Sequence, residues 1–317
     1  MSQARVRIIV FGYHTIGYLC LQELIERGEE VSAVITHRDD PGEHIWFDSV
    51  AELARSAGIA VFQPRHPNTS AFVNLIRALQ PELIFSFYYR RLLSKELLAI
   101  PPRGGINLHG SLLPQYRGRS PVNWVLVNGE RQTGVTLHYM TEKADAGDII
   151  AQRPVEITFA DTALTLFRKV VQAALALFQE TFPLMKAGLA PRIPQDPAQA
   201  TCYGGRRPED GKIEWVRPAL ALYNLIRAVT APYPGAFTWY QGKKLYVWSS
   251  CPSAVPGESG RIPGTILGVR DGGCLVATGE GNLLLTQMQW QGEEMLSGEA
   301  FVDKHGLGIG DRLGEDA

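Results

Sequence analysis

The chain has 317 residues, with 31 basic and 32 acidic side chains, and hydrophobic residues make up 45% of it. These values are typical of a globular protein with about two domains of ~150 residues each. The balanced charge excludes a general electrostatic attraction to nucleic acid or to an anionic membrane. A membrane span is not predicted, because the sequence has no run of about 18 apolar residues.

The cysteines and the amino terminus indicate a reducing compartment. Cys20, Cys202, Cys251 and Cys274 show no C-x-x-C spacing, so we predict neither a disulfide framework nor a metal site. The first residues begin a strand pattern at once and contain no apolar signal region. We therefore expect a cytoplasmic protein with no membrane contact.

In the first part of the chain, short apolar runs alternate with stretches that have helical spacing. Strands are predicted over residues 6–12, 30–37, 59–64, 83–87, 104–110, 133–140 and 148–158, and helices over 15–28, 47–58, 70–80, 121–129 and 161–188. Asp161 or Thr162 is the expected N-cap of the last helix. This alternation predicts an α/β, Rossmann-like, mostly parallel sheet with helices on both faces, over residues 1–188.

Residues 189–213 are rich in proline, glycine and polar side chains, which predicts a linker. Arg206 and Arg207 in this stretch are interpreted as solvated linker residues. A helix over 218–231 follows. Short strands separated by turn signals are then predicted over residues 235–240, 243–250, 264–270, 273–278 and 281–290. We therefore predict a second, small β-rich domain over 214–317, a barrel or sandwich similar to an OB fold.

The first strand is not followed by a nucleotide-binding motif. Gly12 and Gly17 lack the middle glycine of G-x-G-x-x-G, and Tyr18 and Leu19 stand where a P-loop needs lysine and a hydroxyl residue. Hydride transfer with NAD is accordingly not expected.

Three polar residues are predicted to meet at one edge of the sheet. Asn107 and His109 end the strand over 104–110, two residues apart and therefore on one side of it, and Asp145 follows the next strand. An imidazole can move a proton near neutral pH, a carboxylate favours its charged form, and an amide N–H can stabilise an oxyanion. Ser111 is followed by "LLP" and not by a helix start, so no activated nucleophile is present. The residues suit direct acyl transfer to a second substrate, although turn and capping roles remain an alternative.

The order of these residues resembles a known family. N-x-H-x-S-L-L-P at residues 107–114, Y-R-G-R at 116–119 and D-A-G at 145–147 are similar to the folate-dependent formyltransferases. Four longer sequence segments most resemble the formyltransferase domains of bifunctional polymyxin-resistance enzymes. They are "FSFYYRRLL", "NLHGSLLPQYRGRSPVNWVLVNGE", "TGVTLH" and "ADAGDIIAQ". Those domains formylate UDP-4-amino-4-deoxy-L-arabinose for the modification of lipid A in lipopolysaccharide. The likeness extends from near the first residue to about Ser250.

The resemblance implies roles for individual residues. Asn107 would stabilise the oxyanion, His109 would transfer the proton, and Asp145 would orient His109 and favour its protonated form. The formyl donor would be N10-formyltetrahydrofolate. Its expected contacts are Arg91, Leu92, Leu93, Arg119, Thr141, Glu142, Lys143, Ala144 and Asp145. Backbone groups just past a strand end are available to a pterin edge, which supports the first three.

The acceptor is predicted to be a nucleotide sugar. A tRNA enzyme needs a basic surface, whereas residues 36–49 carry Asp39, Asp40, Glu43 and Asp48 against one Arg38. Candidates for acceptor binding, by position alone, are Tyr13, His14, Ser111 and Arg117.

Four alternatives stay open, and none of them involves a metal. The chain could be a formyltransferase for another nucleotide-linked amino sugar, a methionyl-tRNA formyltransferase, a formyltetrahydrofolate hydrolase, or a binding protein without catalysis.

Overall fold

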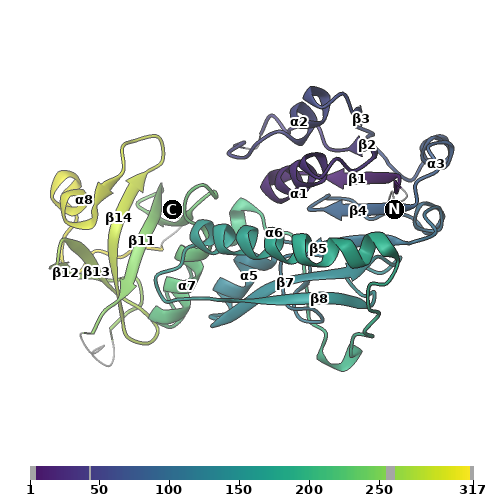
Figure 1. Ribbon diagram of the computed structural model, residues 1–317. Coiled ribbons are helices and arrows are strands. Elements are labelled where there is room, and N and C mark those ends of the chain that lie inside the picture. The colour runs from purple at the N-terminus through teal and green to yellow at the C-terminus, as the bar shows by residue number, and fades with distance from the viewer. Residues whose placement is uncertain (1–4, 43, 255–260, 315–317) are drawn as a thin grey trace. The chain divides into compact units, whose positions relative to one another are not determined.

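The computed structural model describes residues 5–42, 44–254 and 261–314 (Figure 1). These residues form two compact units. The first unit comprises the described residues of 1–121, 132–156 and 167–204, and the second those of 122–131, 157–166 and 205–317. Two short segments, 122–131 and 157–166, therefore belong to the second unit although the chain around them belongs to the first.

The first unit is built on a seven-stranded sheet. Its strands are β1 (Ile8–Gly12), β2 (Val31–Ile35), β3 (Ala60–Phe62), β4 (Leu83–Phe87), β5 (Gly105–His109), β7 (Gln132–Tyr139) and β8 (Ile149–Glu156), in the order β3-β2-β1-β4-β5-β7-β8. The pairs from β3 to β5 are parallel, whereas β5 pairs with β7, and β7 with β8, in antiparallel fashion. The predicted mostly parallel sheet is confirmed.

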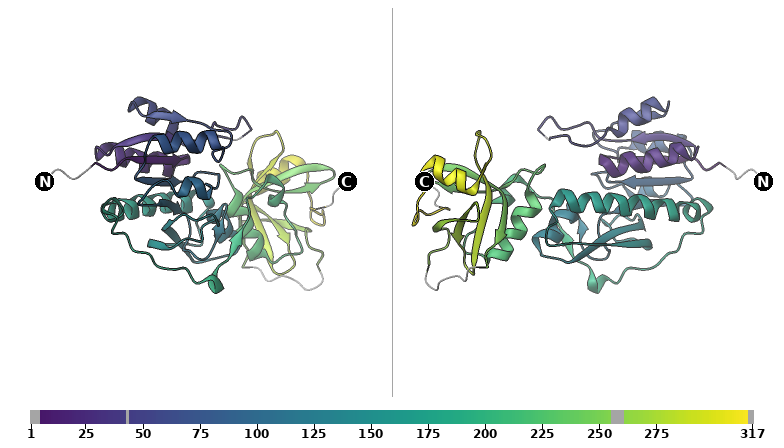
Figure 2. Two further views of the ribbon diagram at one scale, coloured as in Figure 1. Left: turned by 90° about the vertical axis from the view of Figure 1, so that its right-hand side faces the viewer. Right: turned by 60° about the vertical axis from the view of Figure 1, so that its left-hand side comes forward.

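Helices cover both faces of this sheet, so that β1 and β4 are buried at every position. Ile9 and Ile84 point to one face, where they belong to a core cluster with Phe72 and Ile76 of α3 (Ser70–Ala78). Phe85 points to the other face, where its ring lies 5.4 Å from that of Phe178 in α6 (Ala163–Ala187). Figure 2 shows α6 as the long teal helix that runs beside the sheet strands. The remaining helices of this unit are α1 (His14–Glu26), α2 (Val50–Ser56) and α4 (Lys95–Leu98).

The expected start of α6 is confirmed by its hydrogen bonds. The Thr162 hydroxyl accepts the backbone N–H of Thr165 at 3.3 Å, as an N-cap side chain does. Asp161, the other candidate, instead accepts the Thr165 hydroxyl and the Thr158 N–H.

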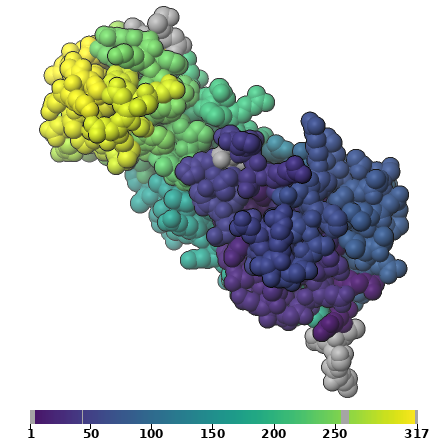
Figure 3. Space-filling model, turned by 90° about the horizontal axis from the view of Figure 1, so that it is seen from above, coloured from purple at the N-terminus to yellow at the C-terminus, as the bar shows by residue number. Residues whose placement is uncertain are grey.

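The second unit contains an antiparallel sheet, as predicted. It consists of β10 (Ala236–Tyr240), β11 (Lys243–Pro252), β12 (Ile266–Arg270), β13 (Gly273–Ala277), β14 (Asn282–Trp290) and β15 (Leu296–Ser297), in the order β10-β11-β14-β13-β12 with β15 beside β14. Two helices accompany it, α7 (Ala219–Val229) and α8 (Gly298–His305). In the space-filling view the yellow residues of its last part are gathered together (Figure 3).

Helix α8 is not predicted from the sequence. Its N-cap is Ser297, whose hydroxyl accepts the Ala300 N–H at 3.2 Å, and it ends at Gly306 with φ of 68°. Both are ordinary helix boundary signals, but the eight residues between them carry too weak an apolar pattern to reveal a helix.

The stretch 189–204, predicted as part of a linker, is attached to the first unit. β9 (Cys202–Tyr203) pairs with β6 (Arg117–Gly118), and Ile193 exchanges two backbone hydrogen bonds with Ile149 at 2.8 and 3.0 Å. This part of the chain also forms the short 3₁₀ turn η1 (Pro197–Gln199).

The interpretation of Arg206 as a solvated linker residue is wrong. Its guanidinium lies 4.7 Å from the ring centroid of Trp124 in α5 (Pro121–Val127), and its side chain is half-buried, whereas Arg207 is exposed. Both arginines border the 3₁₀ turn η2 (Pro208–Gly211). An aromatic ring attracts a guanidinium, which explains the burial.

Within the three described ranges, none of the helices is long and apolar enough to cross a membrane.

Candidate active site

Asn107 and His109 lie at the end of β5, between β4 and β7 in the sheet. They are two residues apart and so project to one face. Because β5 and β7 are antiparallel, Asn107 is directly opposite His138, and His109 is opposite Thr136. The pairing thus puts a second histidine on the face that carries the two predicted residues.

Asp145 reaches the same place from the loop between β7 and β8. Its Oδ1 atom lies 3.6 Å from His109 Nδ1 and 3.4 Å from Asn107 Nδ2, and its Oδ2 atom accepts the Gly118 N–H at 2.8 Å. The backbone of Asp145 has φ of 51°, in the left-handed region that a non-glycine residue seldom adopts. The three residues predicted to act together are therefore in contact.

The hydrogen bonds of His109 identify its basic atom. His109 Nε2 lies 2.8 Å from the carbonyl oxygen of Tyr116. Since a carbonyl only accepts, Nε2 must carry a proton, and in the neutral ring the lone pair is on Nδ1. That lone pair is beside the Asp145 carboxylate, so a proton taken up at Nδ1 is stabilised at once by the negative charge. His109 is 6% exposed, which limits the screening by water.

His138 was missed by the sequence reasoning. Its Nδ1 lies 2.9 Å from the Tyr139 carbonyl and so donates to it, which leaves Nε2 of the neutral ring to accept from Asn107 Nδ2 at 3.0 Å. Nε2 also lies 3.5 Å from Asp145 Oδ1, to which the protonated ring can donate. Asn107 Nδ2 thus donates one of its two hydrogens to His138 Nε2. Its second hydrogen has only the longer contact, at 3.4 Å, with Asp145 Oδ1. This second hydrogen is the one that a substrate oxygen can compete for.

Asp145 is held in its charged form by its neighbours. Burial opposes ionisation, but the attraction of the His109 and His138 rings in their protonated forms and the hydrogen bond from the Gly118 N–H outweigh it and hold the pKa of Asp145 well below its usual range. The site therefore contains a fixed negative charge beside a basic nitrogen.

The residues predicted to contact the donor border this edge of the sheet. Leu92 is 60% exposed, Leu93 is buried, and the loop of Thr141, Glu142, Lys143 and Ala144 is exposed. The Leu92 carbonyl already accepts from Asn68 at 3.0 Å. The Arg119 guanidinium donates to the Arg90 carbonyl at 3.4 Å, which brings it to the end of β4.

Two of the predicted acceptor-binding residues are occupied by contacts within the protein. The hydroxyl of Ser111 is completely buried and donates to the Gln115 carbonyl at 2.7 Å. The Arg117 guanidinium donates to Oε1 of Gln195 at 3.1 and 2.6 Å. Ser111 stabilises the turn that presents Tyr116 to His109.

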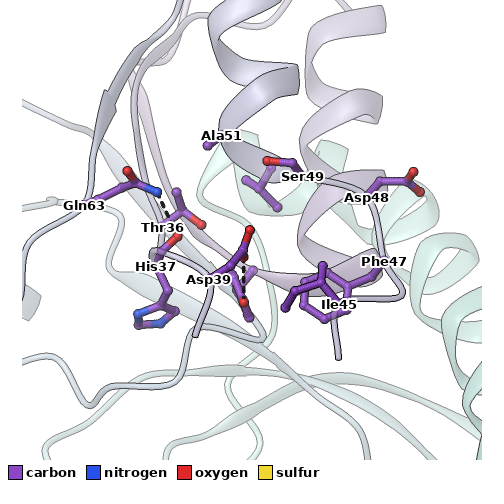
Figure 4. Close-up of a pocket in the computed structure, with 11 residues that line it drawn as sticks. Thr36, His37, Asp39, Ile45, Phe47, Asp48, Ser49, Ala51 and Gln63 are labelled. Carbon is purple, nitrogen blue, oxygen red and sulfur yellow. Dashed lines mark hydrogen bonds between the residues drawn. The ribbon is translucent and has the colours of Figure 1, made fainter. Parts of the chain in front are cut away.

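Tyr13 and His14 belong to an aromatic group beyond β1. The Tyr13 hydroxyl donates to Asp39 at 2.9 Å, and the His14 ring stacks on Phe47 with centroids 3.9 Å apart. Figure 4 shows the small pocket at the ends of β1 and β2 that Tyr13, Asp39 and Phe47 help to line.

Among residues 5–42, 44–254 and 261–314, no three histidine, cysteine or acidic side chains are grouped so that they could hold a metal ion.

Comparison with known proteins assigns this geometry to a family. Residues 4–181 match the family model described as formyl transferase, and residues 206–306 match the one described as formyl transferase, C-terminal domain. The chain belongs to the formyltransferase family. This family takes its formyl group from N10-formyltetrahydrofolate, so the predicted class of enzyme and its predicted donor are confirmed.

Solved structures share the fold of this formyltransferase. HypX from Aquifex aeolicus in complex with tetrahydrofolic acid is 20% identical, with a TM-score of 0.64 over 97% of this chain. The match covers 48% of HypX, so the chain spans about half the length of that protein.

Two smaller enzymes also match. The N-formyltransferase of Helicobacter canadensis, in complex with folinic acid and dTDP-3-aminofucose, is 20% identical with a TM-score of 0.68, over 88% of this chain and 98% of its own. Glycinamide ribonucleotide transformylase 1 from Symbiobacterium toebii is 25% identical with a TM-score of 0.52, over 61% of this chain and 95% of its own. At 20% identity a likeness shows the fold alone, so the acceptor has to be argued from the site.

Proposed function

We propose that the protein transfers the formyl group of N10-formyltetrahydrofolate to the 4-amine of UDP-4-amino-4-deoxy-L-arabinose, with Asn107, His109 and Asp145 as the catalytic residues. The observation that carries the chemistry is the basic Nδ1 atom of buried His109, 3.6 Å from Asp145 Oδ1. A general base needs this combination of an available lone pair and a charge that favours its protonated form.

The backbone past β4 fits the donor. Within the described residues, no hydrogen bond engages the backbone N–H and C=O groups of Arg91 and Leu93, whereas the Leu92 carbonyl is bound by Asn68. A pterin has alternating donors and acceptors along one edge, which such free groups can pair with. Exposed Leu92 adds apolar surface for the ring, whereas the side chain of Leu93 is buried in the core.

His109, Asp145 and Asn107 have different roles in the proposed reaction. His109 Nδ1 takes the proton from the attacking amine, and Asp145 stabilises the resulting imidazolium, which then returns the proton to the leaving nitrogen. Asn107 turns its second hydrogen to the formyl oxygen as that atom gains negative charge. A preorganised donor of this kind is typically worth about 10²–10³ in rate.

Charge and resemblance support a nucleotide-sugar acceptor. The loop after β2 holds Asp39 and Asp48 and so lacks the basic surface that a tRNA enzyme needs for the phosphate backbone. The segments "NLHGSLLPQYRGRSPVNWVLVNGE" and "ADAGDIIAQ" resemble those of the enzymes that formylate the UDP-linked aminoarabinose. On this proposal the protein acts in the cytoplasm, on a precursor for lipid A modification and polymyxin resistance.

A different amino sugar is the second candidate. The Helicobacter canadensis enzyme was solved with dTDP-3-aminofucose and shares the fold over 88% of this chain. The same three catalytic residues would serve a 3-amine or a 4-amine on either nucleotide.

An acceptor panel tests the proposal. The protein is mixed with N10-formyltetrahydrofolate and, separately, with UDP-4-amino-4-deoxy-L-arabinose, dTDP-3-aminofucose, initiator methionyl-tRNA or no acceptor, and the products are weighed by mass spectrometry. We expect formylation of the UDP sugar at the highest kcat/KM. A preference for another acceptor would overturn the substrate and keep the chemistry. Formate released at the same rate without any acceptor would instead identify a hydrolase.

A further inference from the structure

We infer that Gln195 is a positioning residue of the active site, which holds Asp145 in the place where it serves His109 and Asn107. This inference rests on the proposed function. Residue 195 lies between the two matched regions, 4–181 and 206–306, and neither region includes it. The segment around it has the composition of a linker, and nothing in the family resemblance assigns it a role.

Gln195 differs from its neighbours in burial. It is half-buried, while every other side chain from residue 191 to residue 199 is exposed. A single inward-facing amide in an exposed, proline-containing stretch indicates a specific contact.

The side chain of Gln195 uses its full hydrogen-bonding capacity on the site. Nε2 donates to the backbone carbonyls of Asp145 and Gly147 at 2.8 and 2.7 Å, and Oε1 accepts two N–H groups of Arg117 at 3.1 and 2.6 Å. An amide has two donor hydrogens and two acceptor lone pairs, so all four are satisfied here.

These contacts close a ring of interactions around the catalytic carboxylate. Arg117 binds Gln195, Gln195 binds the backbone of Asp145, and the Asp145 carboxylate accepts the N–H of Gly118, the neighbour of Arg117. Asp145 is thereby held at both its backbone and its side chain.

The conformation of Asp145 explains why it must be held. Its φ of 51° is unfavourable for a non-glycine residue, and such a conformation persists only where surrounding contacts determine it. Without Nε2 of Gln195 the loop can relax, which would move Oδ1 away from His109 Nδ1.

The backbone around Gln195 is itself fixed. Ile193 is bonded to Ile149 on one side, and on the other the Thr201 carbonyl accepts the Arg117 N–H at 2.9 Å. Gln195 can therefore serve as a rigid support and not as a mobile contact.

The test combines two variants with a matched control. Gln195→Leu removes both donors and both acceptors. Gln195→Glu keeps an acceptor for Arg117 but has no N–H for the two carbonyls. Gln199→Leu is the control, because Gln199 is exposed in the same segment and bonds only to Asp196.

We expect both Gln195 variants to lower kcat by about 10- to 100-fold with KM for the donor nearly unchanged, as a misplaced catalytic group does. The Gln199→Leu control should match the wild type. In an Asp145→Asn background, adding Gln195→Leu should not lower the single-turnover rate further, because Gln195 acts on the rate by positioning the Asp145 carboxylate, which this background already lacks. A further loss equal to that in the wild-type background would overturn the inference.

Hydrogen–deuterium exchange gives a readout that does not depend on the acceptor. In Gln195→Leu, the Gly118 amide and the peptide covering residues 141–148 should exchange faster than in the wild type and in Gln199→Leu. Unchanged exchange there would overturn the inference even if no acceptor is formylated. Faster exchange together with an inactive wild type would support the positioning role and refute the proposed function.

Discussion

Asn107 Nδ2 lies 3.0 Å from Nε2 of His138, the residue directly opposite it on β7. Because His138 donates from Nδ1 to the Tyr139 carbonyl, its Nε2 can only accept in the neutral ring, and this orients the Asn107 amide with its nitrogen toward the site. The orientation of the Asn107 amide, the proposed oxyanion donor, is thus set by His138.

The first prediction concerns His138. His138→Leu leaves Asn107 without an acceptor and should lower kcat about tenfold or more, whereas His138→Gln offers an oxygen in the place of Nε2 and should retain most of the activity. Steady-state kinetics on both variants, with melting temperatures to compare their folding, would check this. Equal activity in the two variants would show that the Asn107 contact is unimportant.

The second prediction concerns Asn107 itself. Asn107→Ala removes the hydrogen-bond donor to the formyl oxygen and should lower kcat by about 10²–10³. The exposed Asn74 on α3 provides the matched control, since Asn74→Ala deletes the same amide away from the site. Turnover close to that of the Asn74 variant would contradict the assigned role.

The third prediction follows from the lowered pKa of Asp145. A carboxyl whose folded pKa is depressed stabilises the protein above its ordinary pKa of 3.8, and this stabilisation is lost as the pH falls toward the folded pKa. Between about pH 5 and pH 3 the unfolded chain takes up the proton and the folded protein does not. The contribution of Asp145 to the free energy of unfolding should therefore fall by about 1 kcal/mol.

Urea unfolding at these two pH values measures that change. Asp145→Asn should show a smaller loss between them than the wild type. An identical pH dependence in the two proteins would mean that Asp145 is not held in its charged form.

The fourth prediction concerns His37, beside the pocket of Figure 4. Burial, together with the charges of Arg90 and Arg91, lowers the pKa of His37 from 6.5 to about 4. Below pH 6.5 the unfolded chain therefore binds a proton at His37 that the folded protein does not bind. The contribution of neutral His37 to the free energy of unfolding is complete above pH 6.5 and is lost as the pH falls toward 4. Melting temperatures at about pH 7.5 and pH 5 should show a smaller loss for His37→Gln than for the wild type. Exposed His66, changed to glutamine, is the control, and a loss equal to the wild type's in His37→Gln would refute the assignment.

Much of the fold follows from local pattern. β4 was predicted with its observed limits because "LIFSF" is a short apolar run that starts two residues after a proline and ends before polar residues. Asn107 and His109 were found because residues two apart in a strand share a face, and Asp145 because it follows a neighbouring strand.

Contacts between distant segments could not be predicted in the same way. The pairing of Asn107 with His138 depends on the antiparallel register of β5 and β7, which no single residue encodes. Gln195 is 50 residues from Asp145 along the chain, and its proline-rich segment indicates a linker and not a contact with the site. Burial of Arg206 likewise depends on Trp124, far away in sequence.

In the proposed mechanism, His109 Nδ1 transfers the proton during formyl transfer to the amine. The most direct measurement is the single-turnover rate of His109→Gln with N10-formyltetrahydrofolate and UDP-4-amino-4-deoxy-L-arabinose, followed by mass spectrometry. Glutamine keeps an N–H for the Tyr116 carbonyl but has no basic nitrogen. We expect a rate about 10²–10⁴-fold lower, with the donor bound as tightly as by the wild type. A rate close to the wild type's, with the donor equally bound, would contradict it.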